Sequence, residues 1–314
     1  MNDTSFTQAD AFYPRDVVGY ADRPPTPSWP RNARLAVQFV VNYEEGGESC
    51  VLHGDRKSET YLTELVGSQP LENSRSLTIE SLYEYGSRVG FWRLLQLFND
   101  RRLKFTAFAV AMALKRNPRA ALALVEGGHE IASHGWRWID YHDVDEITER
   151  EHIRLAVATI AELTGSRPLG WYTGRVSPNT RRLVAEEGGF LYDADSYSDD
   201  VPYWESVDGK PQLIIPYTLD VNDMKFGAAQ GFNCGEQFFT YLKDSFDCLY
   251  QEGAEQARML SVGLHCRISG KPGRIQALGR FLDYIQGFDD IWICRRIDIA
   301  RHWRTHNPYS ENKS

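Results

Sequence analysis

Short apolar runs alternate with amphipathic segments along most of this chain. Six of the runs have the length of a buried strand. They cover residues 35–41, 105–110, 130–133, 213–215, 259–264 and 291–294. The clearest amphipathic segment is 146–164, where Ile153, Val157, Ile160 and Ala161 share one helical face and Gly165 supplies a C-terminal stop. Further helices are expected at 79–99, 178–187, 236–251 and 272–286.

The alternation of strands with helices predicts an α/β fold with a parallel sheet. Six or seven such units, without a Gly/Ser-rich linker or an internal repeat, favour a single-domain, closed or nearly closed β/α barrel over two half-domains. We place this barrel at residues 35–304 and a short C-terminal tail at 305–314. Residues 1–34 are rich in proline, which disfavours helices and sheet ladders, so an extended arm packed on the body or on a neighbour is expected.

Composition narrows the class of protein and its partners. The 314 residues are 42% hydrophobic and 25% charged, which excludes disordered, collagen-like and small disulfide-stapled proteins. A net charge of -8 gives no basic patch for nucleic acid or an anionic membrane, so the expected partner is a small molecule. No stretch approaches the roughly 18 apolar residues of a membrane span, and no secretory signal pattern is visible. Five widely spaced cysteines without a C-x-x-C pair favour a reduced cytoplasmic compartment.

Four expected strand ends carry polar side chains. In parallel α/β folds the chemistry gathers at the carboxyl ends of the strands. The four segments read N-Y-E-E-G-G-E at 42–48, H-G-W-R-W at 134–138, W-Y-T-G-R at 171–175 and H-C-R at 265–267.

The first of these ends holds two adjacent acids, Glu44 and Glu45, which cannot both point the same way on an extended chain. One of them could face the pocket as a general base toward water. An isolated acidic pair before two glycines also fits a solvated turn, and the residues alone leave both readings open.

The other ends hold imidazole and guanidinium groups. His134 could ligate a metal, transfer a proton or serve the fold, but no local His/Cys cluster supplies the three ligands of a catalytic zinc. His265 precedes a basic, glycine-bearing segment that could bind an anion or form a flexible loop. Arg175 could hold a carbonyl or carboxylate bidentately, or form a surface ion pair. Taken together, four polar strand ends in one barrel favour a shared site.

In order and spacing, these segments resemble the motifs of the polysaccharide deacetylase (NodB homology) superfamily. Its T-F-D-D-G, H-S/T-x-x-H, R-x-P and L-H motifs correspond to N-Y-E-E-G at 42–46, H-G-W-R-W at 134–138, G-R-V-S-P at 174–178 and L-H at 264–265. The resemblance spans residues 35–300 and implies a distorted (β/α)7 barrel.

The departures from that pattern concern the metal. In the metal-dependent deacetylases the first Asp is the base, and the second Asp and two His hold the metal. The resemblance gives Glu44 the base position, Glu45 a ligand position and His134 another, whereas Trp138 replaces the second imidazole. An indole N–H is a donor only and cannot ligate a cation. The metal site therefore looks dismantled, and no metal and no cofactor are expected.

This set of departures resembles the metal-independent bacterial allantoinases recruited from that superfamily. Long matching segments are N-Y-E-E-G-G-E-S-C-V-L-H-G-D at 42–55, S-H-G-W-R-W-I-D-Y at 133–141, G-W-Y-T-G-R at 170–175 and I-P-Y-T-L-D-V-N-D-M at 215–224. The resemblance implies hydrolysis of the hydantoin ring of allantoin to allantoate in purine breakdown, and a homo-oligomer, expected to be a tetramer.

Roles follow for the matching residues. We expect Glu44 to deprotonate water, His265 to act as general acid or to hydrogen-bond the leaving nitrogen, and Arg175 with His134 to stabilise the oxyanion or position carbonyls. The further candidates for substrate binding are Glu45, Trp138, Trp171, Tyr172, Asn222 and Asp223.

Three alternatives remain. One is a metal-dependent deacetylase of N-acetylated oligosaccharides with an unusual ligand set, which the fold favours and Trp138 opposes. A second is a hydrolase of another cyclic ureide or imide. A third is a catalytically inactive carbohydrate-binding relative, which the retention of Glu44, Arg175 and His265 opposes.

Overall fold

The computed structural model describes residues 13, 15–26, 29–65, 67–228, 230–256 and 258–310. Residues 1–12, 14, 27 and 28 of the expected arm and residues 311–314 of the expected tail lie outside the described residues. No helix in the described ranges combines the length and the apolar character that crossing a bilayer requires.

The sheet is built around β1 (Leu35–Tyr43), all nine residues of which are buried. A strand covered on both faces reads as a continuous apolar run, as this one does. It pairs in parallel with β8 (Arg258–His265) on one side, and with β9 (Ile291–Cys294) and then β2 (Thr106–Ala109) on the other. Asn42 pairs with His265 in the ladder to β8, so the residues that follow these two strands start at the same level.

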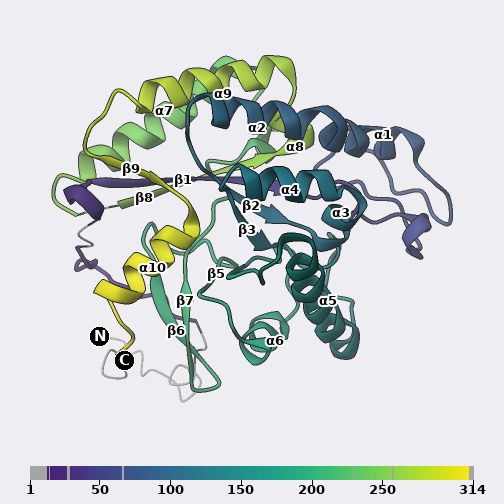
Figure 1. Cartoon of the computed structure of the whole chain (residues 1–314), viewed down its shortest axis with the longest axis horizontal. Helices are drawn as coiled ribbons and strands as arrows, with labels where there is room; N and C mark the ends of the chain where they lie inside the picture. Colours follow the sequence, from purple (N-terminus) through teal and green to yellow (C-terminus); the bar gives the residue numbers. More distant parts are fainter. Residues whose placement is uncertain are drawn as a thin grey trace, which may run out of the picture.

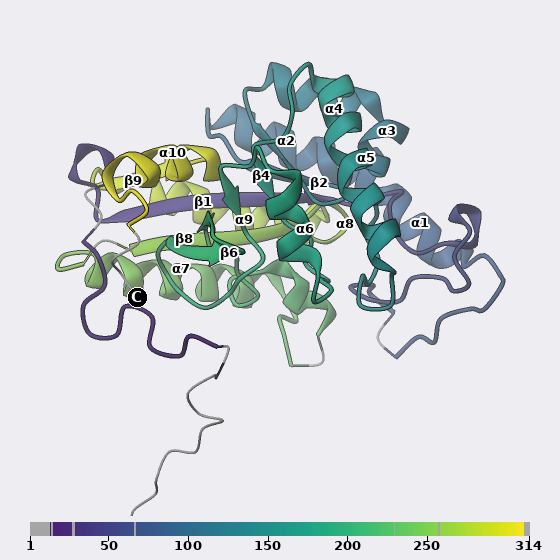
Figure 2. The same ribbon diagram turned by 90° about the horizontal axis from the view of Figure 1, so that it is seen from below.

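The rest of the sheet continues beyond β2 through β3 (Glu130–Ser133), β4 (Gly170–Trp171), β5 (Tyr192–Asp193) and β7 (Lys210–Ile214). The last strand, β6 (Tyr203–Val207), forms an antiparallel hairpin with β7. In the described part of the chain, no ladder joins β6 back to β8, so the sheet is an open half-barrel. Figures 1 and 2 show the curved sheet with helices packed against it, and β1 as the long purple strand through its middle.

The helices confirm the predicted alternation. The α-helices are α1 (Leu77–Tyr85), α2 (Phe91–Asp100), α3 (Ala111–Arg116), α4 (Pro118–Glu126), α5 (Glu146–Thr164), α6 (Thr180–Glu187), α7 (Gly235–Glu252), α8 (Cys266–Ser269), α9 (Pro272–Ile285) and α10 (Arg296–His306). Short 3-10 turns are η2 (Pro30–Asn32), η3 (Val51–His53) and η5 (Asp223–Gly227). Helix α5 has the predicted bounds, with Asp145 as its N-cap and Gly165 in a left-handed conformation at its end.

The predicted helix 79–99 is interrupted. A π-helical turn, η4 (Gly86–Gly90), separates α1 from α2. Both glycines are required by close packing: a Cβ on Gly86 would lie 2.3 Å from Oε1 of Glu45, and one on Gly90 would lie 2.0 Å from the carbonyl oxygen of Cys266. The π turn thus lets this layer approach the carboxyl ends of β1 and β8.

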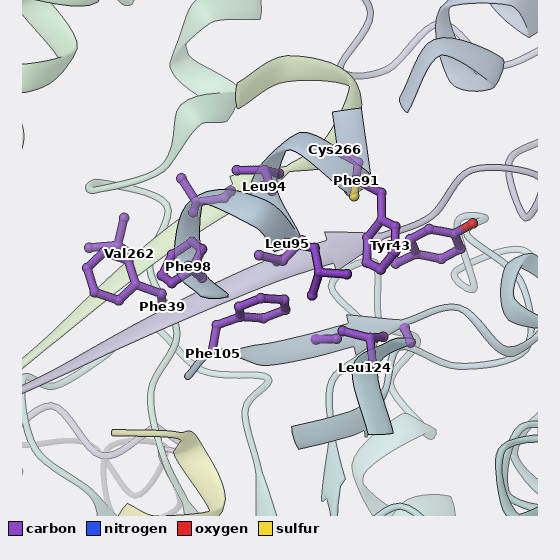
Figure 3. Packing of buried hydrophobic residues seen from close by; sticks show 14 of the residues in the cluster. Phe39, Tyr43, Phe91, Leu94, Leu95, Phe98, Phe105, Leu124, Val262 and Cys266 are labelled. Atoms are coloured by element: carbon purple, nitrogen blue, oxygen red, sulfur yellow. The ribbon is translucent and has the colours of Figure 1, made fainter. Parts of the chain in front are cut away.

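Apolar side chains fill both faces of the sheet. Between the sheet and the outer helices, the rings of Phe39, Phe98 and Phe105 meet edge to face, and Phe91 packs on Tyr43 in the same way (Figure 3). A second cluster fills the inside of the half-barrel, with an aromatic layer of Phe108, Tyr172 and Tyr217.

Both flanking segments attach to the barrel where they are described. The Tyr20 hydroxyl donates to the carbonyl of Pro202, and the Trp29 indole donates to the carbonyl of Arg258. At the other end α10 runs two residues into the expected tail, and Trp204 donates to the carbonyl of Asn307 and packs on Tyr309.

Candidate active site

The turn after β1 brings Glu44 to the carboxyl edge of the sheet. Glu44 accepts a hydrogen bond on its carbonyl from Gly47, and Gly46 adopts a φ of +100° that favours glycine. Gly47 lies so close to Val110 that a Cβ would come within 2.4 Å of that side chain. The two glycines therefore mark a tight, packed turn rather than a solvated one.

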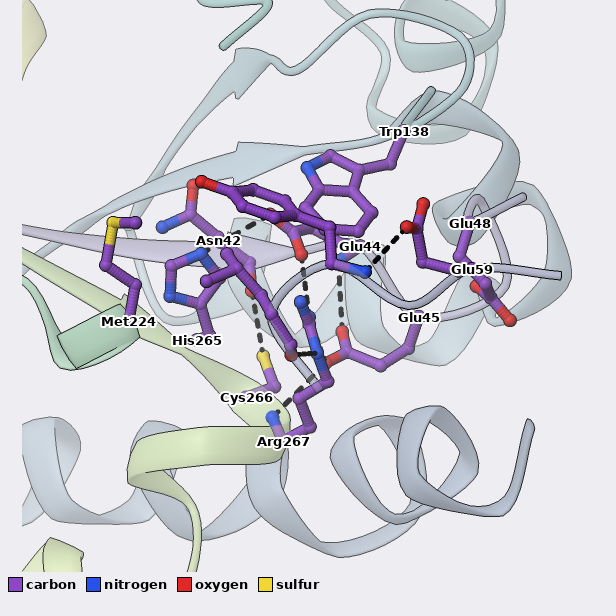
Figure 4. Close-up of polar contacts among 12 residues, drawn as sticks. Asn42, Glu44, Glu45, Glu48, Glu59, Trp138, Met224, His265, Cys266 and Arg267 are labelled. Atoms are coloured by element: carbon purple, nitrogen blue, oxygen red, sulfur yellow. Dashed lines mark hydrogen bonds and ion pairs between the residues drawn. The ribbon is translucent and has the colours of Figure 1, made fainter. Parts of the chain in front are cut away.

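Three predicted residues meet at this edge. Oε1 of Glu44 lies 3.4 Å from Nε2 of His134 and 3.5 Å from Nε2 of His265. Figure 4 shows Glu44 and His265 at this edge. The three side chains are at most 4% exposed. They come from the ends of β1, β3 and β8, as the shared-site argument predicts.

His265 lies between two carboxylates. Its Nδ1 is 2.6 Å from Oδ1 of Asp223, and its backbone N–H donates to the other oxygen of Asp223. Burial would lower the pKa of His265, but the charges of Glu44 and Asp223 outweigh it and raise the pKa to about 9. With a carboxylate facing each ring nitrogen, His265 is an imidazolium at neutral pH.

Arg267 is a site residue that the sequence analysis missed. Its Nη1 lies 2.6 Å from Oε2 of Glu44 and 3.7 Å from Oε1 of Glu45. Burial would raise the pKa of Glu44, but the charges of Arg267 and His265 hold it well below its ordinary value. The signal was present: Arg267 stands two residues after His265 in the basic segment that we noted.

Glu45 lies near Glu44, and its carboxylate holds the backbone of two turns. Its carboxylate accepts hydrogen bonds from the backbone N–H groups of Glu44 and Arg267. Burial raises the pKa of Glu45 to about 7, against the opposing charge of Arg267. These bonds tie the end of β1 to the start of α8, and a contact of Glu45 with substrate stays a prediction.

Arg175 and Trp138 form one stacked unit. The Arg175 guanidinium lies 4.4 Å from the centre of the Trp138 ring, and Nη2 donates to the Trp138 carbonyl and to Glu59 at 2.9 and 3.0 Å. The Tyr61 ring also stacks on the Trp138 ring, and the two ring centres are 6.0 Å apart. Arg175 therefore forms an ion pair with a buried partner, Glu59, rather than a surface pair, while its own buried Nε has no partner.

The other predicted side chains divide between the site and the fold. Tyr172 lies against the site, its ring centre 4.9 Å from that of His134. Trp171 faces the opposite way, donates to Thr173 and packs on Phe190, because neighbouring strand residues point to opposite faces.

Asn222 and Asp223 hydrogen-bond within the protein, and their expected contacts with substrate stay a prediction. Asn222 caps η5 by accepting from the backbone of Met224, and its amide donates to the carbonyl of Thr218. Asp223 is fully buried and holds His265. The turn at 222–223 thus positions the imidazole from behind.

The comparisons with known proteins agree with this fold. Residues 71–190 match the family model described as Polysaccharide deacetylase. A Schizosaccharomyces pombe protein provisionally named as a polysaccharide deacetylase is 45% identical over 315 residues, which cover 94% of this chain and 98% of that protein. The chain belongs to the polysaccharide deacetylase family.

Two crystal structures of similar proteins superpose on nearly the whole of this chain. A protein from Pseudomonas aeruginosa PAO1, also provisionally named as a polysaccharide deacetylase, is 61% identical with a TM-score of 0.93, covering 95% of this chain and 100% of that chain. PuuE allantoinase is 59% identical with a TM-score of 0.93, covering 95% of this chain and 99% of that chain.

The metal site of the metal-dependent deacetylases does not fit these residues. Trp138 presents a ring where the resemblance requires a ligand imidazole. Both oxygens of Glu44 face cationic or N–H groups, and His265 has a carboxylate at each nitrogen. Among the described residues, no group of three or more His, Cys, Asp and Glu side chains is arranged to hold a metal ion.

Proposed function

We propose that this protein is an allantoinase that opens the hydantoin ring of allantoin by hydrolysis and yields allantoate in purine breakdown. The observation that carries the proposal is the similarity to PuuE allantoinase, 59% identical over 95% of this chain. The charged cluster around Glu44 supports the same chemistry, because it pairs a carboxylate with an imidazolium.

The chemistry suits a site without a metal. An acetamide has a weakly electrophilic carbonyl and a poor amine leaving group, so a Lewis acid helps greatly. The scissile carbonyl of allantoin is imide-like, and the leaving nitrogen carries a second carbonyl that delocalises developing charge. A carboxylate with a lowered pKa is a weaker base, and this more reactive carbonyl tolerates it.

In the proposed reaction, Glu44 takes a proton from water while the water oxygen bonds to the ring carbonyl carbon. His265 gives its Nε2 proton to the ring nitrogen as the carbon–nitrogen bond breaks, which leaves a urea group and a carboxylic acid. The acid loses its proton to solvent, and Glu44 returns its own proton to His265, 3.5 Å away. Both side chains are then restored.

We assign Arg175 and His134 to the carbonyl oxygens. Arg175 has an unpartnered buried Nε, and His134 lies beside Glu44. Each oriented donor of this kind contributes roughly 3 to 4 kcal/mol to oxyanion stabilisation. Trp138 and Tyr172 would then wall the flat ring.

This proposal is tested by comparing the products that the protein forms from three substrates. Purified protein is incubated separately with allantoin, with hydantoin and with N-acetylchito-oligosaccharides, and allantoate, ring-opened hydantoin and acetate are measured. We expect allantoate with allantoin and no acetate. Release of acetate without any allantoate would replace the proposal with the deacetylase function by which two relatives are provisionally named.

We also propose a cytoplasmic homo-oligomer, a tetramer as in the allantoinases that the chain resembles. The five cysteines are free in the structure. Val17 and Val18, in the described part of the arm, are 72% and 71% exposed, and a neighbouring subunit would cover such apolar side chains. A monomeric mass by light scattering at micromolar concentration would contradict the oligomer.

A further inference from the structure

Arg267 is the buried cation closest to the two acids that follow β1. Its side chain is 3% exposed, and its Nη1 lies between Oε2 of Glu44 at 2.6 Å and Oε1 of Glu45 at 3.7 Å. Two carboxylates this close in a buried site need a positive charge near them, because each repels the other in a medium of low dielectric constant.

Aromatic rings hold the guanidinium in place. Its carbon lies 4.3 Å from the centre of the Tyr83 ring and 5.2 Å from that of the Trp138 ring. Its Nε donates to the carbonyl of Leu62, and its buried Nη2 has no partner. Trp138 thus offers a π face to a cation at the position where the resemblance places a metal-binding imidazole.

We propose that Arg267 is an internal cation that neutralises the Glu44 and Glu45 pair and takes the place a metal ion would need. The substitution of a ligand imidazole by Trp138 and the insertion of the guanidinium are then two parts of one change. This inference is independent of which substrate the protein hydrolyses, because it concerns what the two carboxylates bind.

The test replaces the charge and keeps most of the volume. Arg267→Met is compared with the wild type and with Arg274→Met. Arg274 is a matched control because it also pairs with a glutamate, Glu64, and lies over an aromatic ring, Phe226, outside the site. Each chelated protein is titrated with Co²⁺, and bound cobalt is followed by calorimetry and visible absorption.

Arg267→Met is expected to bind about one Co²⁺ per chain, because without the guanidinium the carboxylates of Glu44 and Glu45 can turn toward a shared cation beside His134, whereas the wild type and Arg274→Met bind none at the same concentrations. Folding of each variant is checked by circular dichroism. Stoichiometric cobalt in the wild type, or none in a folded Arg267→Met protein, would overturn the proposal.

A second variant keeps the proposal testable if Arg267→Met fails to fold. Glu44→Gln added to Arg267→Met removes the buried charge that the arginine neutralised, so the double variant should unfold at a higher temperature than Arg267→Met alone. A double variant that is no more stable than Arg267→Met would show that Arg267 supports the fold without acting as the counter-ion of Glu44.

Discussion

Arg267 and Arg296 are 3% and 0% exposed in the same half-barrel, and their partners differ. Arg296 donates to the Gln38 amide oxygen and to the carbonyls of Ile215 and Pro216. Arg267 instead faces the carboxylates of Glu44 and Glu45. Burial lowers the pKa of Arg296, whereas for Arg267 the neighbouring Tyr83 hydroxyl and the carboxylates outweigh burial and raise the pKa.

Phe108, in the aromatic layer inside the half-barrel, has Arg296 near its ring and the site residue His134 near it as well. The Arg296 guanidinium lies 5.4 Å from the centre of the Phe108 ring, and the His134 ring lies 6.2 Å from the same ring. The hydrogen-bond acceptors of Arg296 are neutral, and they tie parts of the sheet together. Facing charges around Arg267 create a field where β1 and β8 end, which is what proton transfer requires.

The largest effect is expected when a charge at the site is removed while the volume of the side chain is kept. Glu44→Gln is expected to lower kcat by about 100-fold or more, because the base is lost while the shape stays. Glu45→Gln is the control and should be milder, because Glu45 accepts hydrogen bonds from the backbone. Steady-state kinetics on folded variants would contradict the assignment if Glu45→Gln were the more damaging change.

The opposite experiment removes the charge of Arg296. Arg296→Met is expected to lower the free energy of unfolding by about 2 kcal/mol, because buried carbonyls and the Gln38 amide lose their donor. The kcat of the folded fraction should stay near that of the wild type. Urea titration and an activity assay on the same sample check this, and a loss of kcat without a loss of stability would place Arg296 in the catalytic machinery.

Arg175 lies between these extremes, with one ion pair to Glu59 and a ring face on Trp138. Arg175→Lys keeps the charge but not the fork of donors, so kcat/KM should fall by at least about tenfold while the melting temperature stays within a few degrees. A variant that melts early yet has normal turnover per folded molecule would make Arg175 a structural residue.

The smallest effect concerns pH. Because the pKa of His265 is raised from 6.5 to about 9, the protonated acid is present at neutral pH, and kcat/KM should fall as pH rises through about 9. The stability that this proton contributes is complete below pH 6.5 and is lost over the same rise. In Asp223→Asn, this fall of kcat/KM with rising pH should occur about one pH unit lower. If kcat/KM of that variant fell at the same pH as in the wild type, a group other than His265 would be the one that titrates.

Most of the long helices and strands, and the central residues of the site, can be predicted from local sequence patterns. The strand at 130–133, the helix at 146–164 and the meeting of Glu44, His134 and His265 were predicted from apolar periodicity and from the rule on strand ends. Strands β4 and β5 were not recognised, because two residues each carry no periodicity. The π turn η4 was missed because its cause is packing against distant residues.

The missed site residues act across the chain. Arg267 pairs with Glu44 over 223 positions, and Glu59 pairs with Arg175 over 116. Local patterns carry no information on such partners. Trp171 is different: its neighbour Tyr172 faces inward, so strand alternation already predicts that Trp171 faces outward.

The central claim is that the Glu44 and His265 pair hydrolyses allantoin without a metal. The direct test measures bound metals and allantoin turnover on the same sample, before and after exhaustive chelation. We expect turnover to be unchanged in protein with far less than one metal ion per chain. Loss of turnover on chelation, with recovery on adding back one divalent ion per chain, would contradict the claim.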